Sequence, residues 1–478
     1  MPAENLQVTR DRCGRVRSRK DNEGQSHHLY SALLAAAAAL VVLTSVRSVA
    51  ATVPVPITLG QSVVDLNGPW KFHTGDDTAW ADPNFDDSTW ELVDLTAPPG
   101  AHDSDVGLTG YVPGWGARGH RGYSGYAWYR MRVAVDAPAQ EALALSGPPA
   151  VDSAYQVFVN GHLLGGVGRF SEQTPTVFSI QPRVFAIPDS LLGGQQANSA
   201  LVAFRVWMGP WDLADPSAGG IHIAPALGEA SSIDARHQMR WLQTVRGYVV
   251  EVVEAAAFLL LAVMACTLMA FDGSKLAYQW LSTALVLTAL YRANQAIFFW
   301  GQFETVHAAE IISIVLLLPL CLAAWTMAWY AWFHLRDTEW MPIAVRILTL
   351  LYMGAQFLTA SWFHGLFPHW VVATSEFIAT WTRVLFVPLT GLIVYQATRQ
   401  QGRQACFALL GLALISIGLF ASELSRLGIQ GIWFPFGTGV SRTQFAYAAF
   451  DAVLFVLFLR RFLFFARSHR TDVSFPSQ

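Results

Sequence analysis

The chain has 478 residues, of which 53% are hydrophobic and only 14% are charged. A soluble domain carries roughly 25% charged residues, so this composition excludes a wholly water-soluble protein. The net charge is −3, and the sequence has no basic patch interleaved with aromatic residues, so we expect no nucleic-acid partner.

The N-terminal segment, residues 1–51, resembles an export signal. A basic stretch that contains Arg10, Arg12 and Lys20 precedes the apolar run "YSALLAAAAALVVLTSV". This run ends before Arg47 and is shorter than the roughly 20 residues that a membrane-spanning helix needs. Small residues around Ala50 offer a cleavage site. We therefore expect a secretory signal peptide, with an uncleaved anchor as the alternative. Both place residue 52 outside the cytoplasm.

Residues 52–235 have the pattern of short strands punctuated by Gly and Pro. In "YRMRVAV", Tyr129 and Met131 share one face, whereas Arg130 and Arg132 share the other. The segment "AYQVFVNGHLLG" alternates into an Asn-Gly turn at 160–161, which is a strong hairpin signal. The apolar run "LVAFRVW" predicts a further buried strand. We expect an all-β antiparallel sandwich.

The stretch "HTGDDTAWADPNFDDSTWELVDL" contains two acid pairs, Asp76-Asp77 and Asp86-Asp87. Two acids placed across a sugar would suit glycoside hydrolysis, and shared acids could bind calcium. Neighbouring side chains diverge, however, and Asp-Asp-Ser favours turns because the side chains bond the local backbone. We therefore expect structural turns here, and we assign no catalytic residue and no metal site.

Four segments follow one another in this region: "LNGPWKFHTGDDTAWADPNFDDSTWELVDL", "WYRMRV", "VFVNGHLLG" and "LVAFRVW". Their order is similar to that of the landmarks in the galactose-binding-like jelly roll, and in particular in the sugar-binding domain of family 2 glycoside hydrolases. The matching positions are Leu66-Asn67-Gly68, Trp70, Phe72, Phe85-Asp86-Asp87-Ser88, Trp90, Tyr129-Arg130 and Val159-Asn160-Gly161. The resemblance covers about 60–228 and implies saccharide binding. It does not imply catalysis, because that family carries its active site on a separate barrel domain, and this chain has apolar runs where the barrel would be.

Two segments of this region carry the aromatic and polar side chains that ligand sites use. They are "GYVPGWGARGHRGYSGYAWY" and "WMGPWDLADPSAGG". An aromatic ring could stack on a pyranose while a polar side chain bonds its hydroxyls. The alternative is that the aromatics contact the membrane or the helices. The six candidate ligand-binding residues are Trp115, Arg118, His120, Trp207, Trp211 and Asp212.

Residues 236–466 contain seven apolar stretches, each long enough to cross a bilayer. They lie at about 247–271, 276–299, 308–333, 341–362, 371–396, 404–422 and 443–465. Lys and Arg are absent from the loops 300–307 and 363–370, and they occur in the loops on the other side and in the tail. By the positive-inside rule, we expect the β-domain outside the bacterial inner membrane and the tail 467–478 in the cytoplasm. Only Arg426 and Arg442 break this pattern.

The predicted spans carry unexpected charged residues, which are Glu251, Glu254, Arg292, Glu376, Arg383 and Asp451, and we expect Glu251, Glu254, Arg292 and Asp451 to form an intramembrane polar group. Such charges are costly and usually face the interior of a helix bundle. At about 1.5 Å per residue, nearly all of these charges lie in the outer half of the membrane. We expect either a polar cavity that opens outward, with a Glu254–Arg292 ion pair, or interfacial packing pairs. A transporter would more often hold charges at the midplane.

A jelly roll followed by seven spans resembles the bacterial seven-transmembrane receptors with diverse intracellular signalling modules. The resemblance implies a sensor that binds a carbohydrate-like ligand outside and signals through seven helices to a cytoplasmic protein. This sequence has only residues 467–478 after the last span, so the output would be a partner or a domain missing from a truncated sequence.

Two other functions remain open. A membrane-bound glycan-processing enzyme could use the Asp pairs, His120 or His364; a transporter is less favoured. We expect membrane lipid as a partner and no cofactor or metal, because the four cysteines form no Cys-x-x-Cys motif and no Cys/His cluster.

Overall fold

The computed structural model describes residues 63–472, apart from 103–107, 135–141, 172–173, 192–198, 215, 272–273, 336–338, 364–365, 428 and 430–439. The chain divides into two units, Met1–Gly60 and Gln61–Gln478, and the described residues belong to the second. The expected signal peptide and His364 lie outside the described residues.

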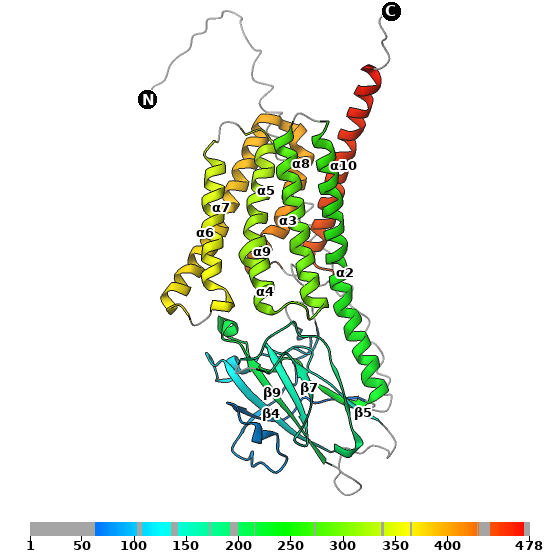
Figure 1. Cartoon of the computed structure of the whole chain (residues 1–478), viewed down its shortest axis with the longest axis vertical. Coiled ribbons are helices and arrows are strands. Elements are labelled where there is room, and N and C mark those ends of the chain that lie inside the picture. The colour runs from blue at the N-terminus through cyan, green and yellow to red at the C-terminus, as the bar shows by residue number, and fades with distance from the viewer. Residues whose placement is uncertain are drawn as a thin grey trace, which may run out of the picture. The chain divides into compact units, whose positions relative to one another are not determined.

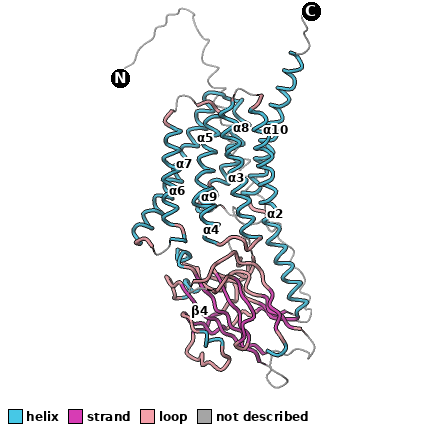
Figure 2. Tube along the Cα trace, viewed as in Figure 1, coloured by secondary structure: helices cyan, strands magenta, loops and turns pink. Residues whose placement is uncertain are grey.

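The N-terminal part of the second unit is a β-sandwich-like pair of antiparallel sheets, as the alternating pattern predicts (Figure 2). The four-stranded sheet has the order β1-β10-β5-β8, and the six-stranded sheet has the order β3-β2-β4-β9-β6-β7. The described strands are β1 Val63–Asp65, β2 Trp70–Thr74, β3 Glu91–Val93, β4 Gly125–Ala134, β5 Leu143–Ser146, β6 Ala154–Val159, β7 His162–Val167, β8 Val184–Ile187, β9 Ser199–Met208 and β10 Ala226–Glu229.

The core of this region lies between the sheets and follows the period of two along each strand. β4 pairs with β9 over its whole length, with Tyr129 opposite Phe204. Both side chains are buried in one cluster with Trp70 and Phe72, and the rings of Phe72 and Tyr129 are 4.9 Å apart. The predicted division of β4 into two faces is confirmed.

The hairpin predicted from the Asn-Gly pair is also present. β6 and β7 pair with Val159 opposite His162, which leaves Asn160 and Gly161 as a two-residue turn. Both have positive φ, 47° and 84°, as a type I′ turn requires. The Asn160 side chain also accepts a bond of 2.8 Å from the amide of Leu201, which ties the turn to β9.

The C-terminal part is helical (Figure 1). The longer elements are α2 Ala230–Met269, α3 Lys275–Trp300, α4 Val306–Glu310, the π-helix η5 Ile311–Leu317, α5 Leu318–Trp332, α6 Met341–Thr359, α7 His369–Gln401, α8 Cys406–Leu419, α9 Ala421–Arg426 and α10 Arg442–Asp472. A helix lies in each of the seven predicted ranges.

Four described segments are long and apolar enough to cross a membrane: Tyr248–Met269, Val306–Trp332, Met341–Thr359 and His369–Gln401. A fifth apolar helix, Cys406–Leu419, is shorter. The chain is therefore compatible with a membrane protein, and the count of seven crossings stays a prediction.

The π-helix η5 lies directly before Pro319, the second residue of α5. Proline has no amide hydrogen, and its ring clashes with the carbonyl of the residue four positions earlier. A wider turn relieves that clash, so a π-helical segment is the expected response to a proline inside an apolar helix.

Strand β10 continues directly into helix α2. Glu229 is both the last residue of β10 and the N-cap of α2. The sequence analysis began the first span at about residue 247, but the helix already begins at Ala230. With 40 residues, α2 is about 60 Å long at 1.5 Å per residue. Its first turns therefore belong with the sandwich, and its last turns form the first predicted span.

Candidate functional site

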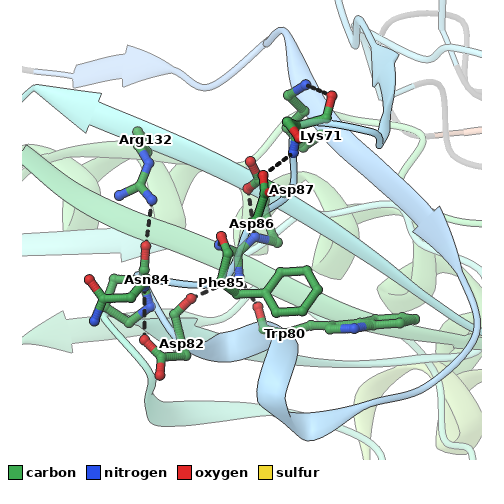
Figure 3. Close-up of polar contacts among 11 residues, drawn as sticks. Lys71, Trp80, Asp82, Asn84, Phe85, Asp86, Asp87 and Arg132 are labelled. Atoms are coloured by element: carbon green, nitrogen blue, oxygen red, sulfur yellow. Dashed lines mark hydrogen bonds and ion pairs between the residues drawn. The ribbon is translucent and has the colours of Figure 1, made fainter.

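One member of each acid pair caps a turn, as predicted. Asp77 Oδ1 accepts a bond of 2.8 Å from the amide of Ala79 at the start of the short helix η1, Thr78–Ala81. Asp86 Oδ1 accepts one of 3.0 Å from the amide of Ser88 (Figure 3). The bonds from the Ser88 backbone and hydroxyl lower the pKa of Asp86. Both side chains therefore serve the local backbone.

The other member of each pair forms an ion pair with a distant arginine. Asp76 binds Arg205 through both carboxylate oxygens, with Oδ1 2.7 Å from Nε and Oδ2 2.5 Å from Nη2. Asp87 Oδ2 lies 2.8 Å from Nε of Arg130. Turn chemistry alone therefore does not account for these two acids. The sequence interpretation missed the role of Arg205. The alternation of side chains along β9 was the one signal that could have placed Arg205 on the face of the sheet that Asp76 contacts.

Arg130 is the centre of the acid-rich loop. Its side chain is fully buried, and its guanidinium donates to the carbonyl oxygens of Trp80 and Asp82. It donates to Phe85 O as well, at 3.3 Å. The loop thus covers the face of β4 that carries Arg130. Nearby, Arg132 donates to Pro83 O on the same loop (Figure 3).

The first candidate ligand segment packs into the sandwich. Trp115 begins the short helix η2, Trp115–Arg118, and is only 1% exposed. Its Nε1 donates to Tyr123 O at 3.2 Å, so neither ring face is open to a pyranose in this conformation. Arg118 donates to the carbonyl oxygens of Pro113 and Asp94, at 3.1 and 2.9 Å. Both residues hold the loop in place.

His120 lines a small pocket beside this segment. Tyr123 and Leu213 share the lining with His120, and the pocket, which is partly open to solvent, has a volume of about 10 Å³. That volume holds about one water molecule, so a sugar ring would have to displace the surrounding loops. The Nε2 atom of His120 lies 3.0 Å from Oε2 of Glu91, whose side chain is well exposed. Of the six candidate residues, His120 lines this pocket, and its side chain is 22% exposed.

The second candidate segment reaches the helices. Trp207 is buried and packs edge-on against Trp211, with ring centroids 5.4 Å apart. Trp211 lies in the short helix η4, Pro210–Ala214, and meets His307 of α4 at 4.5 Å and 78°. The structure therefore agrees with the alternative interpretation of Trp211, in which the aromatic side chain contacts the helices.

Asp212 lies beside a buried polar group within the sandwich. Its Oδ2 accepts a bond of 2.8 Å from the Ser153 hydroxyl, which itself accepts one of 3.0 Å from the Gly209 amide. Burial and the nearby charge of Asp152 raise the pKa of Asp212 to about 6. For Asp152, burial disfavours the charge, but its 2.7 Å contact with His222 outweighs this and lowers the pKa.

A loop of the sandwich contacts the last turn of α3, the loop that follows it and the first residue of α4. Gln181 Nε2 donates to Phe299 O at 3.0 Å. Arg183 donates to the side chain of Gln302 at 2.6 Å. These bonds, together with that from the amide of Val306 to a sandwich carbonyl at 3.0 Å, join the two regions at a second place besides β10 and α2.

The first turns of α2 are held against the four-stranded sheet. Ile233 is fully buried with Ala144 and Ala226. Arg236 forms an ion pair of 2.6 Å with Asp65 of β1. Because an apolar contact and a charged contact both lie on the outer turns, α2 is fixed to the sheet that it extends.

Three of the predicted charged residues in the helices contact one another, and an uncharged side chain that was not predicted joins them. Arg292 Nε donates to Glu254 Oε2 at 2.9 Å, so the predicted ion pair is present. Arg292 Nη2 also lies 2.5 Å from Glu251 Oε1. Gln444 of α10, which the sequence interpretation missed, donates to the same oxygen at 2.9 Å. Within the described part of the chain, no hydrogen bond or ion pair joins Asp451 to these groups, and its role stays a prediction.

Among the residues that the structure describes, no group of three or more His, Cys, Asp or Glu side chains is placed to hold a metal ion.

No protein-family model and no curated protein matches the chain. Among solved structures it is similar to a β-glucuronidase of Bacteroides uniformis, at 24% identity, with a TM-score of 0.25 over 35% of this chain and 18% of that chain. A β-glucuronidase from glycoside hydrolase family 2 matches at 21% identity and a TM-score of 0.25, over 36% and 18%. A β-glycosidase of Bacteroides vulgatus matches at 19% identity and a TM-score of 0.22, over 34% and 20%.

The chain thus spans about a fifth of the length of these glycosidases. TM-scores this low do not identify the function of this chain.

Proposed function

We propose that the chain is a membrane sensor in which the β-sandwich binds a carbohydrate-like ligand and the helices carry the signal. The observation that supports this proposal is the continuity of β10 with α2. A flexible linker would let the two regions move independently, whereas a strand that becomes a helix without a break transmits displacement. Movement of the sheet that contains β10 therefore moves the helix that carries Glu251 and Glu254.

A sensor needs two states that the ligand distinguishes, since a ligand shifts an equilibrium only by its differential affinity. Two joints are available for such a change. One is the contact of α2 with the four-stranded sheet, where Ile233 and Arg236 lie. The other is the contact of Trp211 with His307. A ligand that alters the segment 207–220 would act on the second joint directly.

The ligand class comes from the sequence. The landmark residues resemble those of a galactose-binding-like jelly roll, and that resemblance favours a saccharide. We place the ligand beside His120 and Arg121, because both line the pocket and the buried Trp115 and Trp207 leave these polar groups as the accessible ones. The loops around the pocket would open to admit a sugar ring.

The proposed topology has seven crossings, with the sandwich outside the bacterial inner membrane and the C-terminus in the cytoplasm. The loop charges support this orientation. The output would be a cytoplasmic signalling protein or an output domain. Membrane-impermeant thiol reagents, applied to single-cysteine variants in intact cells, would test the orientation: a cysteine replacing the exposed Leu163 of β7 should react, and one replacing Arg470 should not.

A glycan-processing enzyme is the alternative function. Its most obvious catalytic acids are the pairs Asp76-Asp77 and Asp86-Asp87, and each of these four carboxylates already caps a turn or binds an arginine. A transporter is the third possibility. Neither alternative has a specific contact in its favour.

A glycan array probed with the full chain in lipid nanodiscs would test the ligand. We expect binding to at least one saccharide class, and we expect His120→Ala to weaken it about tenfold, or roughly 1.4 kcal/mol. His162→Ala, in the exposed strand β7, is the matched control and should bind as the unmodified chain does. Binding to no saccharide would exclude the ligand proposal, and equal losses in both variants would exclude this site.

A further inference from the structure

The helices contain a buried cluster with more negative than positive charge. Glu251 and Glu254 are three residues apart and therefore lie on one face of α2. Both meet the single guanidinium of Arg292 from α3. Glu251 is 7% exposed, Glu254 3% and Arg292 4%. Two carboxylates and one guanidinium leave a net charge of −1 if all three are ionised.

The two oxygens of each carboxylate in this cluster differ in their hydrogen bonds. Glu251 Oε1 faces Arg292 and also accepts a bond from Gln444, and Glu254 Oε2 accepts from Arg292. The second oxygen of each carboxylate, Glu251 Oε2 and Glu254 Oε1, is buried and accepts no hydrogen bond from any residue in the described ranges. Buried acceptors of this kind are costly unless they are paired.

Among the described residues, Arg292 is the cation that forms ion pairs with the two carboxylates. The ring of Tyr447 on α10 lies 5.1 Å from the guanidinium of Arg292. Asp451, on the same helix, adds another carboxylate on the side of Glu254. The titratable and charged groups that act on the cluster from the described parts of the packed helices are Tyr291 and Arg292 on α3, Cys321 on α5, Arg383 on α7, and Tyr447 and Asp451 on α10.

We propose that this cluster is a proton-binding site, in which Glu254 Oε1 carries the proton and Glu251 stays ionised. One proton cancels the net charge of the three groups and turns an unpaired acceptor into a hydroxyl. Glu254 is the holder because Glu251 has the additional donor Gln444, which stabilises its ionised form. A metal cation would sit beside the guanidinium that already bridges both carboxylates and would be repelled by it.

The site joins three helices, so its protonation state bears on their packing. α2, α3 and α10 each contribute a residue to it, Glu254, Arg292 and Gln444. Loss of the proton would leave an uncompensated charge in a bundle interior, which is strongly unfavourable. The packing of α2 against its neighbours therefore weakens as the proton is released, and this response needs no sandwich ligand.

Infrared spectroscopy of the full chain in nanodiscs would test the proposal, because a protonated carboxyl has a C=O stretching band that a carboxylate lacks. We expect the unmodified chain at neutral pH to show this band in a form that resists exchange into heavy water. Glu254→Gln should abolish it. Glu376→Gln, which changes an exposed glutamate on α7, is the matched control and should retain it.

Three results would overturn the proposal. The first is the absence of the band from the unmodified chain at neutral pH, which needs no variant and so does not depend on a variant folding. The second is loss of the band in Asp451→Asn or Glu251→Gln but not in Glu254→Gln. The third is stabilisation by sodium ions at constant pH that Glu254→Gln removes, which would assign a cation instead. None of these results bears on whether the sandwich binds a saccharide.

Discussion

Arg130 and Asp87 form a 2.8 Å ion pair in which the arginine side chain is wholly buried. The guanidinium also serves the carbonyl oxygens of Trp80 and Asp82. The acid-rich loop and the central strand β4 are therefore one structural unit, and the acids that resembled a catalytic pair hold that unit together.

Replacing Arg130 with Met should destabilise the sandwich strongly. The variant leaves Asp87 and three loop carbonyls without their donor, and breaking a buried ion pair by removing one partner costs about 3–5 kcal/mol. Thermal unfolding of the full chain, followed by near-ultraviolet circular dichroism, would show the loss. Arg132→Met removes a neighbouring arginine that contacts only Pro83 O among the described residues, and it should cost much less. Similar losses in both variants would contradict the central role of Arg130.

Ile233 should be required for the attachment of α2 to the sandwich. It is fully buried between Ala144 and Ala226, and Ile→Ala at a buried site costs about 2–5 kcal/mol. Hydrogen exchange should show reduced protection of residues 230–240 in Ile233→Ala. Met239→Ala, at an exposed position on the same helix, should leave protection unchanged. If Ile233→Ala also leaves it unchanged, the outer turns of α2 are held by other contacts.

The pH dependence of stability should include a contribution from Asp212. Its folded pKa of about 6 lies above the ordinary value of 3.8, so the folded state binds its proton more tightly than the unfolded state does. Protonated Asp212 therefore adds to the free energy of unfolding. This stabilisation is complete below pH 3.8 and is lost as the pH rises through 6, and its size is on the order of 3 kcal/mol. Asp212→Asn should flatten this part of the profile, measured as Tm against pH. Asp189→Asn, at an exposed position, should leave the profile unaltered.

Two glycines in similar backbone conformations should respond differently to alanine. Gly122 and Gly220 have φ of 82° and 87°, and an L-residue in the left-handed region costs about 1–2 kcal/mol. A Cβ on Gly122 meets no atom within 4 Å, whereas one on Gly220 would overlap the hydroxyl of Tyr129. Overpacking adds about 1–3 kcal/mol, so the Tm of Gly220→Ala should fall further. Equal Tm values would show that Tyr129 can move aside.

Local patterns in the sequence predicted the elements of this chain well. The two faces of β4, the turn at Asn160-Gly161 and the helical ranges depend on residues only a few positions apart, so alternation and turn chemistry reveal them. The Glu254–Arg292 pair was also predictable, because charged side chains at similar depths in apolar helices have few partners other than each other.

Tertiary structure decided the surroundings of the candidate site. Alternation places Arg130 on the face opposite Tyr129, but its burial depends on a loop that lies more than 40 residues earlier in the chain. Trp115 is a residue type that can stack on a sugar ring, but its packing against Gly219 and Gly220 makes it a core residue. Contacts with β1 and β5 likewise hold the N-terminal turns of α2, which lie before the predicted span.

The sequence by itself determined which segments are strands, which are apolar helices and where turns occur, because those properties come from neighbours along the chain. Only the tertiary structure decided which acid of each pair binds an arginine, which aromatic rings are accessible, and that the sheet continues into a helix. These outcomes depend on contacts between distant segments, and burial, the largest free-energy term in folding, is a property of such contacts.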